Sequence, residues 1–334
     1  MDEIAKIVAD IKAGNIKPIY FLMGEEPYYI DKLSEFIENN ILEEHEKDFN
    51  QTVLYGRDVT VEDIVSASKR FPMMADKQVI IVKEAQELAR TIENLEKYCE
   101  SPMLSTVLVI CYKYKTLDKR KKTLKNISKN GLVFESKKLY DNQVGQWITR
   151  ILQPKDYKID AKASAMLVEF LGTDLGKISN ELDKLQIILP KGSTITDKHI
   201  EENIGFSKDF NVFELRKAIG ERNQLKAYKI VKYFAENPKD NNIVMVVGLI
   251  FSFFIQVQKY HGTKETNPAK VAPILGISPF FIKDYDVAKK NFDMRKVSQV
   301  LNTLRDIDVK SKGVGANAWS LQDLYKEMLL KVFL

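Results

Sequence analysis

Uniformly apolar runs alternate with amphipathic segments over the first 140 residues. Five of these runs predict strands, at residues 17–23, 49–55, 78–85, 105–113 and 131–136, and the first of them is expected to be buried. An amphipathic helix is expected at the start of the chain, and further helices at 27–42, 60–71 and 89–100, with Pro27 in a first turn and Thr60 as an N-cap. Because the strands are apolar throughout and separated by helices, the pattern indicates a parallel sheet covered on both faces.

After about residue 140 the strand-like runs stop and helical periodicity remains. Helices are expected at 142–153, 161–171 and 174–189, and a short one after Thr196. About six more helices follow from Asn211 to the end of the chain. The pattern therefore predicts an α/β domain at 1–140, a small helical domain at 141–209 and an all-helical domain at 210–334.

The composition is that of an ordinary globular protein, with 45% hydrophobic and 29% charged residues. The start of the chain lacks the features of a signal peptide. The most apolar stretch, residues 243–257, is short for a bilayer span and favours a buried core helix. Two cysteines and three scattered histidines offer neither a disulfide framework nor metal-ligand spacing. We therefore predict a cytoplasmic protein without a membrane partner or a metal.

The turn after the first strand occupies the place where phosphate-binding α/β proteins carry a glycine-rich loop. Here the turn reads "MGEEPYYID", with a single glycine, no lysine at the required offset, and two carboxylates, Glu25 and Glu26, that would repel phosphate. A near miss at Gly176–Lys177 has the wrong spacing and lies between predicted helices. No nucleophile–base arrangement is visible elsewhere. The sequence thus predicts no catalytic residues and no bound cofactor.

The net charge of +5 is unevenly distributed, because residues 112–130 hold eight Lys or Arg residues against one Asp. Within this stretch, the spacing over 113–129 fits an amphipathic helix with Leu117, Leu124 and Ile127 directed inward. Such a run is compatible with a solvated helix face and also with nucleic-acid contact. The sequence alone leaves both interpretations open.

The stretch "RFPMMADKQVIIV", residues 70–82, places two methionines at the tip of a helix-to-strand connection. Met73 and Met74 could fold back onto their own domain. They could also anchor a partner protein, because methionine is adaptable and common at binding surfaces. Local sequence does not decide between these alternatives.

Several segments, in order along the chain, resemble the delta subunit family of the bacterial DNA polymerase III clamp loader. The similar segments are "KPIYFLMGEEPYYIDK", "RFPMMADKQVIIVKEAQEL", "YKTLDKRKKTLKNISK", "GTDLGKISNELDKLQIIL", "VFELRKAIGERN" and "DIDVKSKGVGANAWSLQDLYKEML". The resemblance implies an AAA+-like first domain without a functional P-loop, then a helical lid domain, then an all-α collar domain for oligomerisation.

In that family the delta protein opens the ring-shaped sliding clamp (beta), and an apolar pair on the first domain enters a hydrophobic pocket of the clamp. Carried over by resemblance, the pair is Met73 and Met74, with Phe71 and Pro72 shaping the approach. Family members often have leucine or an aromatic residue at the pair. Two methionines depart from that pattern while keeping its apolar volume.

The resemblance also implies partners and a division of labour. ATP would be bound by the gamma/tau subunits and not by this chain, and delta-prime and primer–template DNA would complete the assembly. Candidates for lying near DNA are Lys119, Arg120, Lys121, Lys122 and Lys312. Two other functions stay open as alternatives. One is an autonomous nucleic-acid-binding protein that uses 113–129, and the other is an AAA+ ATPase with an unusual phosphate loop.

Overall fold

The computed structural model describes residues 2–203, 210–239, 241–265, 267–315 and 319–334. The chain forms two compact units. The first comprises Met1–Val144 with Leu171–Asn180, and the second Gly145–Phe170 with Glu181–Leu334. The finer division into three domains stays a prediction, and its boundary at residue 209 lies outside the described residues.

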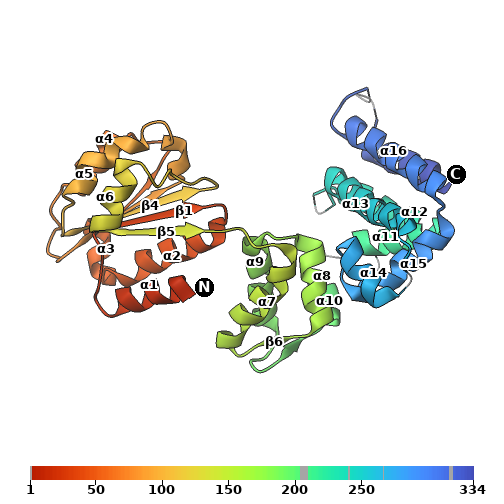
Figure 1. The fold of residues 1–334 in the computed structure, drawn as a ribbon, viewed down its shortest axis with the longest axis horizontal. Helices are drawn as coiled ribbons and strands as arrows, with labels where there is room; N and C mark the ends of the chain where they lie inside the picture. Colours follow the sequence, from red (N-terminus) through yellow and green to blue (C-terminus); the bar gives the residue numbers. More distant parts are fainter. Residues whose placement is uncertain (1, 204–209, 240, 266, 316–318) are drawn as a thin grey trace. The chain divides into compact units, whose positions relative to one another are not determined.

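The first unit is built on a five-stranded parallel sheet with the order β2-β3-β4-β1-β5 (Figure 1). The strands are β1 (Ile19–Gly24), β2 (Gln51–Tyr55), β3 (Gln78–Lys83), β4 (Thr106–Lys113) and β5 (Leu132–Ser136). All five predicted strands are therefore confirmed, as is their parallel pairing. Central strands β1, β3 and β4 are almost entirely buried, which explains their unbroken apolar sequences.

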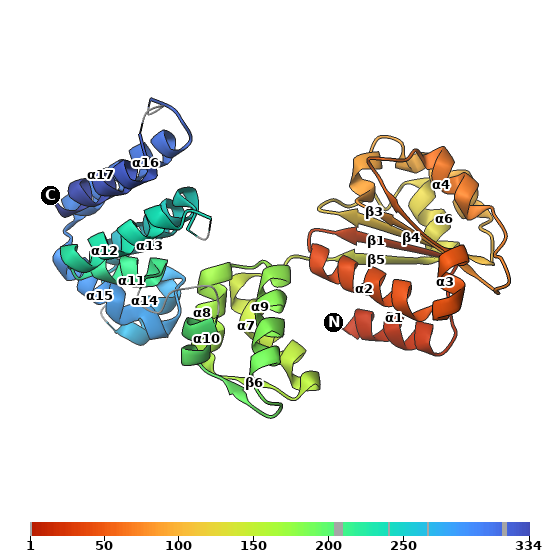
Figure 2. The same ribbon diagram turned by 180° about the vertical axis from the view of Figure 1, so that it is seen from behind.

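Helices cover both faces of this sheet, as predicted (Figure 2). One face packs on α1 (Asp2–Lys12) and α2 (Pro27–Asn40), and the other on α4 (Val61–Ser68), α5 (Glu96–Glu100) and α6 (Lys122–Asn130). Side chains of β1 alternate accordingly, with Tyr20 and Leu22 toward α2, and Phe21 and Met23 toward α6. Because the helices after β1 and β4 lie on opposite faces, the carboxyl ends of these neighbouring strands form the position where α/β proteins usually bind ligands.

Three local predictions in the segments before β4 were wrong. The segment 49–55 is a strand only from Gln51, because a short helix, α3 (Glu44–Asn50), runs into it from a Glu43–Glu46 capping box. The segment 89–100 is not one helix. It holds a 3₁₀ turn (Ile92–Leu95) and the single turn of α5, and another 3₁₀ turn (Ala85–Leu88) precedes it. The predicted helix at 60–71 ends at Ser68, before the tip.

Beyond β5 the predicted helices are confirmed as α7 (Asp141–Leu152), α8 (Ala161–Leu171), α9 (Leu175–Ile188) and α10 (Asp197–Asn203). A 3₁₀ turn, Gln153–Lys155, follows α7. The expectation that strands stop after residue 140 was wrong in one place. A short parallel pair joins β6 (Lys158–Ile159) to β7 (Thr194–Ile195), and each strand is too short to show a pattern in sequence.

The rest of the second unit contains seven α-helices among its described residues, against the six or so expected. They are α11 (Val212–Gly220), α12 (Gln224–Glu236), α13 (Ile243–Gly262), α14 (Pro268–Leu275), α15 (Ile282–Asn291), α16 (Met294–Ser311) and α17 (Leu321–Phe333), with a 3₁₀ turn at Pro279–Phe281. An α/β unit followed by helices confirms the predicted fold class.

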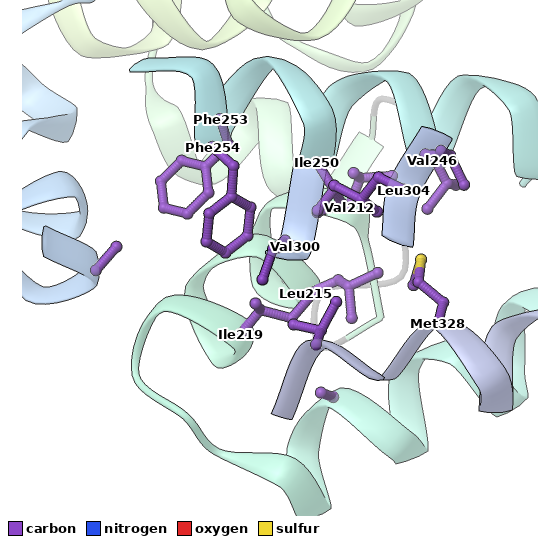
Figure 3. Packing of buried hydrophobic residues seen from close by; sticks show 14 of the residues in the cluster. Val212, Leu215, Ile219, Val246, Ile250, Phe253, Phe254, Val300, Leu304 and Met328 are labelled. Carbon is purple, nitrogen blue, oxygen red and sulfur yellow. The ribbon is translucent and has the colours of Figure 1, made fainter. Parts of the chain in front are cut away.

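Helix α13 is 20 residues long and, within the described part of the chain, the one helix apolar enough to span a membrane by composition. It lies inside the helical core, where eight of its side chains are buried. Figure 3 shows Ile250 of α13 in this core together with Leu304 of α16 and Met328 of α17. The prediction of a buried core helix is confirmed, although the helix extends beyond the apolar stretch that suggested it.

Candidate protein-binding tip of the α/β unit

The connection between α4 and β3, residues 69–77, carries the apolar pair at its tip. Phe71 is 78% exposed, Met73 62% and Met74 102%, whereas Pro72 is half-buried. The methionines therefore do not fold back into the core, and that alternative is wrong. An apolar cluster of this kind on a surface needs an explanation beyond folding.

The backbone of the tip is fixed by the side chain of Asn50, at the end of α3. The Asn50 amide Nδ2 donates to the Met73 carbonyl at 2.9 Å, and the Met73 N–H donates to Asn50 Oδ1 at 2.6 Å. The same Nδ2 also donates to the carbonyl of Glu46 at 3.1 Å. Because Asn50 is only 4% exposed, these bonds are shielded from water and hold Met73 in one backbone conformation.

Met74 adopts a left-handed backbone conformation, with φ of +54°. This region costs a residue with a Cβ about 1–2 kcal/mol. The conformation persists because the chain is held on both sides, by Asn50 before it and by β3 after it. Backbone strain at an exposed apolar residue supports a binding role more than a structural one.

A buried polar network attaches the tip to the body of the unit. Gln78, the first residue of β3, donates from Nε2 to the carbonyl of Arg70 and, at 2.8 Å, to Thr106 Oγ1 on β4. The Thr106 hydroxyl in turn donates to the Ser68 carbonyl at 2.9 Å. These bonds join the end of α4 to the starts of β3 and β4, so that both ends of the tip are anchored.

Two exposed apolar residues near the tip were not predicted from the sequence. Phe49 is 72% exposed and Leu104 is 76% exposed. Phe49 adjoins Asn50, and the carbonyl of Leu104 accepts a hydrogen bond from Lys77 Nζ at 2.9 Å. Phe49 was missed because a strand was incorrectly predicted from residue 49. Leu104 was missed because a single leucine in a loop carries no pattern.

The turn after β1 lies where a phosphate loop would be, and its backbone donors are used inside the protein. The N–H of Gly24 donates to the Lys115 carbonyl at 3.0 Å, and that of Glu25 to the Ser136 carbonyl at 3.1 Å. The N–H of Glu26 donates to Ser136 Oγ at 3.2 Å. A phosphate group would find these three donors already engaged.

Glu26 itself occupies the N-terminus of α2. Its carboxylate accepts the N–H of Tyr28 at 3.1 Å, and the side chain is only 4% exposed. Burial raises the pKa of Glu26 above its ordinary value. The helix end that would attract an anion is therefore already capped by an acidic side chain of the chain itself.

The basic segment 113–129 is a helix only from Lys122, so that the predicted helix was wrong over its first half. Its inward side chains are as predicted, since Leu117, Leu124 and Ile127 are buried. Residues 114–121 instead form a loop between β4 and α6, which Gly24 contacts through Lys115.

Four of the eight basic residues in this segment form ion pairs within the first unit. The pairs are Lys113 with Asp31 and Glu84, both at 2.8 Å, Lys119 with Glu135 at 2.7 Å, Arg120 with Asp118 at 2.7 Å, and Lys121 with Glu93 at 3.1 Å. Burial alone would lower the pKa of Lys113, but its two carboxylate partners raise that pKa above the ordinary value. The local charge excess is thus smaller than the sequence indicates.

The remaining candidates for DNA proximity are distributed over both units. Lys122 begins α6 in the first unit. Lys312 follows α16 in the second unit and pairs with Asp308 at 2.7 Å. Ala316 and Asn317, a few residues after Lys312, lie outside the described residues.

The near-miss motif at Gly176–Lys177 lies in the first turn of α9, as the simpler helix-start interpretation requires. Lys177 Nζ is 3.3 Å from Asp174, and its backbone N–H also donates to the Asp174 carboxylate at 3.0 Å. This lysine therefore belongs to a helix start and not to a turn that follows a strand.

Comparison with known proteins gives consistent results along the chain. The family model described as "DNA polymerase III, delta subunit" matches residues 20–137, and the model for the C-terminal domain of the same family matches residues 209–325. The chain is similar to DNA polymerase III subunit delta of Bacillus subtilis, with 24% identity over 331 residues, 96% of this chain and 95% of the relative. The solved clamp loader delta protein of Bacillus subtilis has the same fold, with a TM-score of 0.61, 21% identity and 99% of each chain covered.

Proposed function

The chain belongs to the delta subunit family of DNA polymerase III, and we propose that it is the non-catalytic clamp-loader subunit that binds and opens the sliding clamp. The ring would be opened at one of its interfaces so that it can be loaded on primed DNA during replication. The observation that carries the proposal is the exposed, conformationally fixed pair Met73–Met74.

In this proposal the two methionine side chains insert into an apolar pocket of the clamp. Each side chain that becomes fully buried contributes about 1.5–3 kcal/mol, so that a single pair can dominate the interface. Opening then requires only that the tip binds the open ring more tightly than the closed ring. Because the tip is already fixed by Asn50, little conformational entropy is lost when it binds.

ATP would act through partner subunits. The engaged donors of the β1–α2 turn and the acidic cap at Glu26 leave no phosphate cradle at the expected place. We therefore assign ATP binding and hydrolysis to the gamma/tau subunits of the assembly. Delta-prime would complete the loader, and the helices from α11 onward would join the collar.

DNA would be contacted within the assembled loader, in the cytoplasm. Lys122 and the paired residues Lys119, Arg120, Lys121 and Lys312 are candidates for this role. Because most of these side chains are already engaged in ion pairs, we expect each to contribute weakly to DNA affinity and the isolated chain not to bind DNA strongly. The alternative of an independent nucleic-acid-binding protein loses part of its support for the same reason.

The direct test replaces Met73 and Met74 together by alanine. We expect clamp affinity, measured by surface plasmon resonance on the immobilised clamp, to fall tenfold or more, because two buried side chains are truncated. Thermal unfolding should be unchanged, since both side chains are exposed in the free protein.

The matched control replaces two other exposed methionines, Met245 and Met294 of the second unit, by alanine. This variant should bind the clamp as the original protein does. Unchanged binding of the Met73→Ala, Met74→Ala variant would contradict the assignment of the tip.

A further inference from the structure

We propose that the clamp-contacting surface is wider than the tip and extends along the amino-terminal edge of β2, β3 and β4. Phe49 and Leu104 would flank Met73 and Met74 as additional contacts. This inference rests on the proposed function and concerns the same partner. It assigns contact residues that neither the sequence pattern nor the family resemblance indicated.

The strand register brings these residues to one edge. Gln51 of β2 pairs with Val79 of β3, and Gln78 of β3 pairs with Thr106 of β4. Phe49 precedes β2 by two residues and Leu104 precedes β4 by two residues, while the tip leads directly into β3. Because the three strands are parallel neighbours, all three segments emerge at the same end of the sheet.

Exposed apolar side chains in the first unit differ in type between the amino and the carboxyl ends of the strands. Among its described residues, the exposed large hydrophobic side chains at the amino edge are Phe49, Phe71, Met73, Met74 and Leu104. The other exposed ones are three tyrosines, Tyr55, Tyr114 and Tyr140, which follow or end strands at the carboxyl side. Tyrosine keeps a hydroxyl for water, whereas phenylalanine, methionine and leucine do not, so the amino edge is the apolar one.

Hydrogen bonds join the three segments into one surface. Asn50, the neighbour of Phe49, is bonded twice to the backbone of Met73. Lys77, at the other end of the tip, donates to the carbonyl of Leu104. The flanking residues are therefore fixed relative to the tip and would meet the same partner.

The shape of this edge indicates the kind of partner. Met74 protrudes with its side chain fully exposed, so that a concave apolar surface can enclose it. In a two-fold contact between two copies of this chain, one protruding tip would meet the other. Two convex surfaces bury little of each other's area. The edge therefore fits a groove on a different protein, with the methionines at its centre and the flanking residues excluding water around them.

The test uses full-length variants Phe49→Ser and Leu104→Ser, singly and together, on the immobilised clamp. We expect each to lower affinity three- to tenfold and the pair to lower it further. Tyr55→Ser is the matched control, because Tyr55 is an exposed aromatic residue at the opposite end of β2, the strand that Phe49 precedes. Thermal unfolding should confirm that all variants fold.

The outcomes separate this inference from the proposed function. If Phe49→Ser with Leu104→Ser binds as Tyr55→Ser does, while Met73→Ala with Met74→Ala fails to bind, the wider surface is wrong and the tip assignment stands. If the methionine pair has no effect, the tip assignment itself is wrong. Concentration-dependent self-association that the Phe49 and Leu104 substitutions abolish would show that the edge joins copies of this chain, which also overturns the inference.

Discussion

At the scale of single residues, Asn50 fixes the backbone conformation of the tip, and it can do so without contacting a partner itself. Its amide satisfies both backbone groups of Met73, and it does so from a different element of the fold. An amide is suited to this task because it offers a donor and an acceptor side by side, matching the C=O and N–H of one residue. Aspartate offers acceptors only.

We therefore expect Asn50→Asp to loosen the tip. The lost bond and the unpaired Met73 carbonyl should cost about 1–3 kcal/mol of folding free energy. Clamp affinity should fall several-fold, mainly through slower association, because the tip must be ordered on binding. Kinetic surface plasmon resonance measures both rates.

A double-mutant cycle distinguishes a positioning role of Asn50 in clamp binding from a role in stability alone. In the Met73→Ala, Met74→Ala background, Asn50→Asp should cause no further loss of clamp binding, because Asn50 acts through those side chains. Asn39→Ala is the control, since its Nδ2 also bonds a carbonyl four residues earlier, that of Glu35, and neither residue belongs to the tip. An equal loss in both backgrounds would refute the positioning role.

The sequence singled out the methionine pair as a candidate because an apolar pair at a turn breaks the expected pattern, and the family resemblance then favoured a binding role. The sequence could not identify Asn50. The partner of its amide is 23 residues away along the chain, and a polar residue at a helix end has many ordinary explanations. Long-range hydrogen bonds of this kind depend on the folded arrangement of two elements, which periodicity does not encode.

At the scale of elements, the β1–α2 turn connects β1 to the end of β5 through close packing and hydrogen bonds. Gly24 has φ of +133°, and a Cβ at this position would lie 2.0 Å from the carbonyl oxygen of Ser136. The turn is therefore pressed against the end of β5, where a ligand-binding loop would need free space.

We expect Gly24→Ala to destabilise the first unit by about 3 kcal/mol or more, because both the backbone conformation and the contact with β5 are violated. Chemical denaturation measures this change. Gly248→Ala in α13 is the matched control, because its Cβ would meet no atom within 4 Å. That substitution should be neutral or stabilising by about 0.5–1 kcal/mol, and equal effects of the two would contradict the role of this turn.

The strands of the sheet could be predicted because each buried strand is apolar on both faces. Helix α3 could not, since "EHEKDFN" is short and charged. The error concealed one end of the apolar edge, because it placed the exposed Phe49 inside the predicted strand. The two-residue strands β6 and β7 fall below the length at which alternation can be seen.

At the scale of the whole molecule, the tip to which we assign clamp binding lies in one unit and most of the helical chain in another. Family models match residues in each unit, and the relative in Bacillus subtilis covers nearly the entire chain. Both units thus match the same family. We assign clamp binding to the first unit and assembly with the other subunits to the helices from α11 onward.

We expect the isolated chain neither to bind nor to hydrolyse ATP. Calorimetric titration with ATP and Mg²⁺ should give no binding heat, because the turn donors are engaged and Glu26 caps α2. Clamp binding by the isolated chain should likewise be independent of ATP. Hydrolysis that disappears in Lys177→Ala but persists in Lys184→Ala, a paired lysine on the same helix, would instead favour the ATPase alternative.

The left-handed conformation of Met74 also has a consequence for inhibitor chemistry. A linear peptide copied from residues 70–77 lacks Asn50 and β3, so that nothing in it maintains a positive φ at methionine. A macrocycle with a D-amino acid at that position would favour the required conformation by its own stereochemistry. Under the clamp binding that we propose, the geometry of this one residue thus specifies how a small competitor should be built.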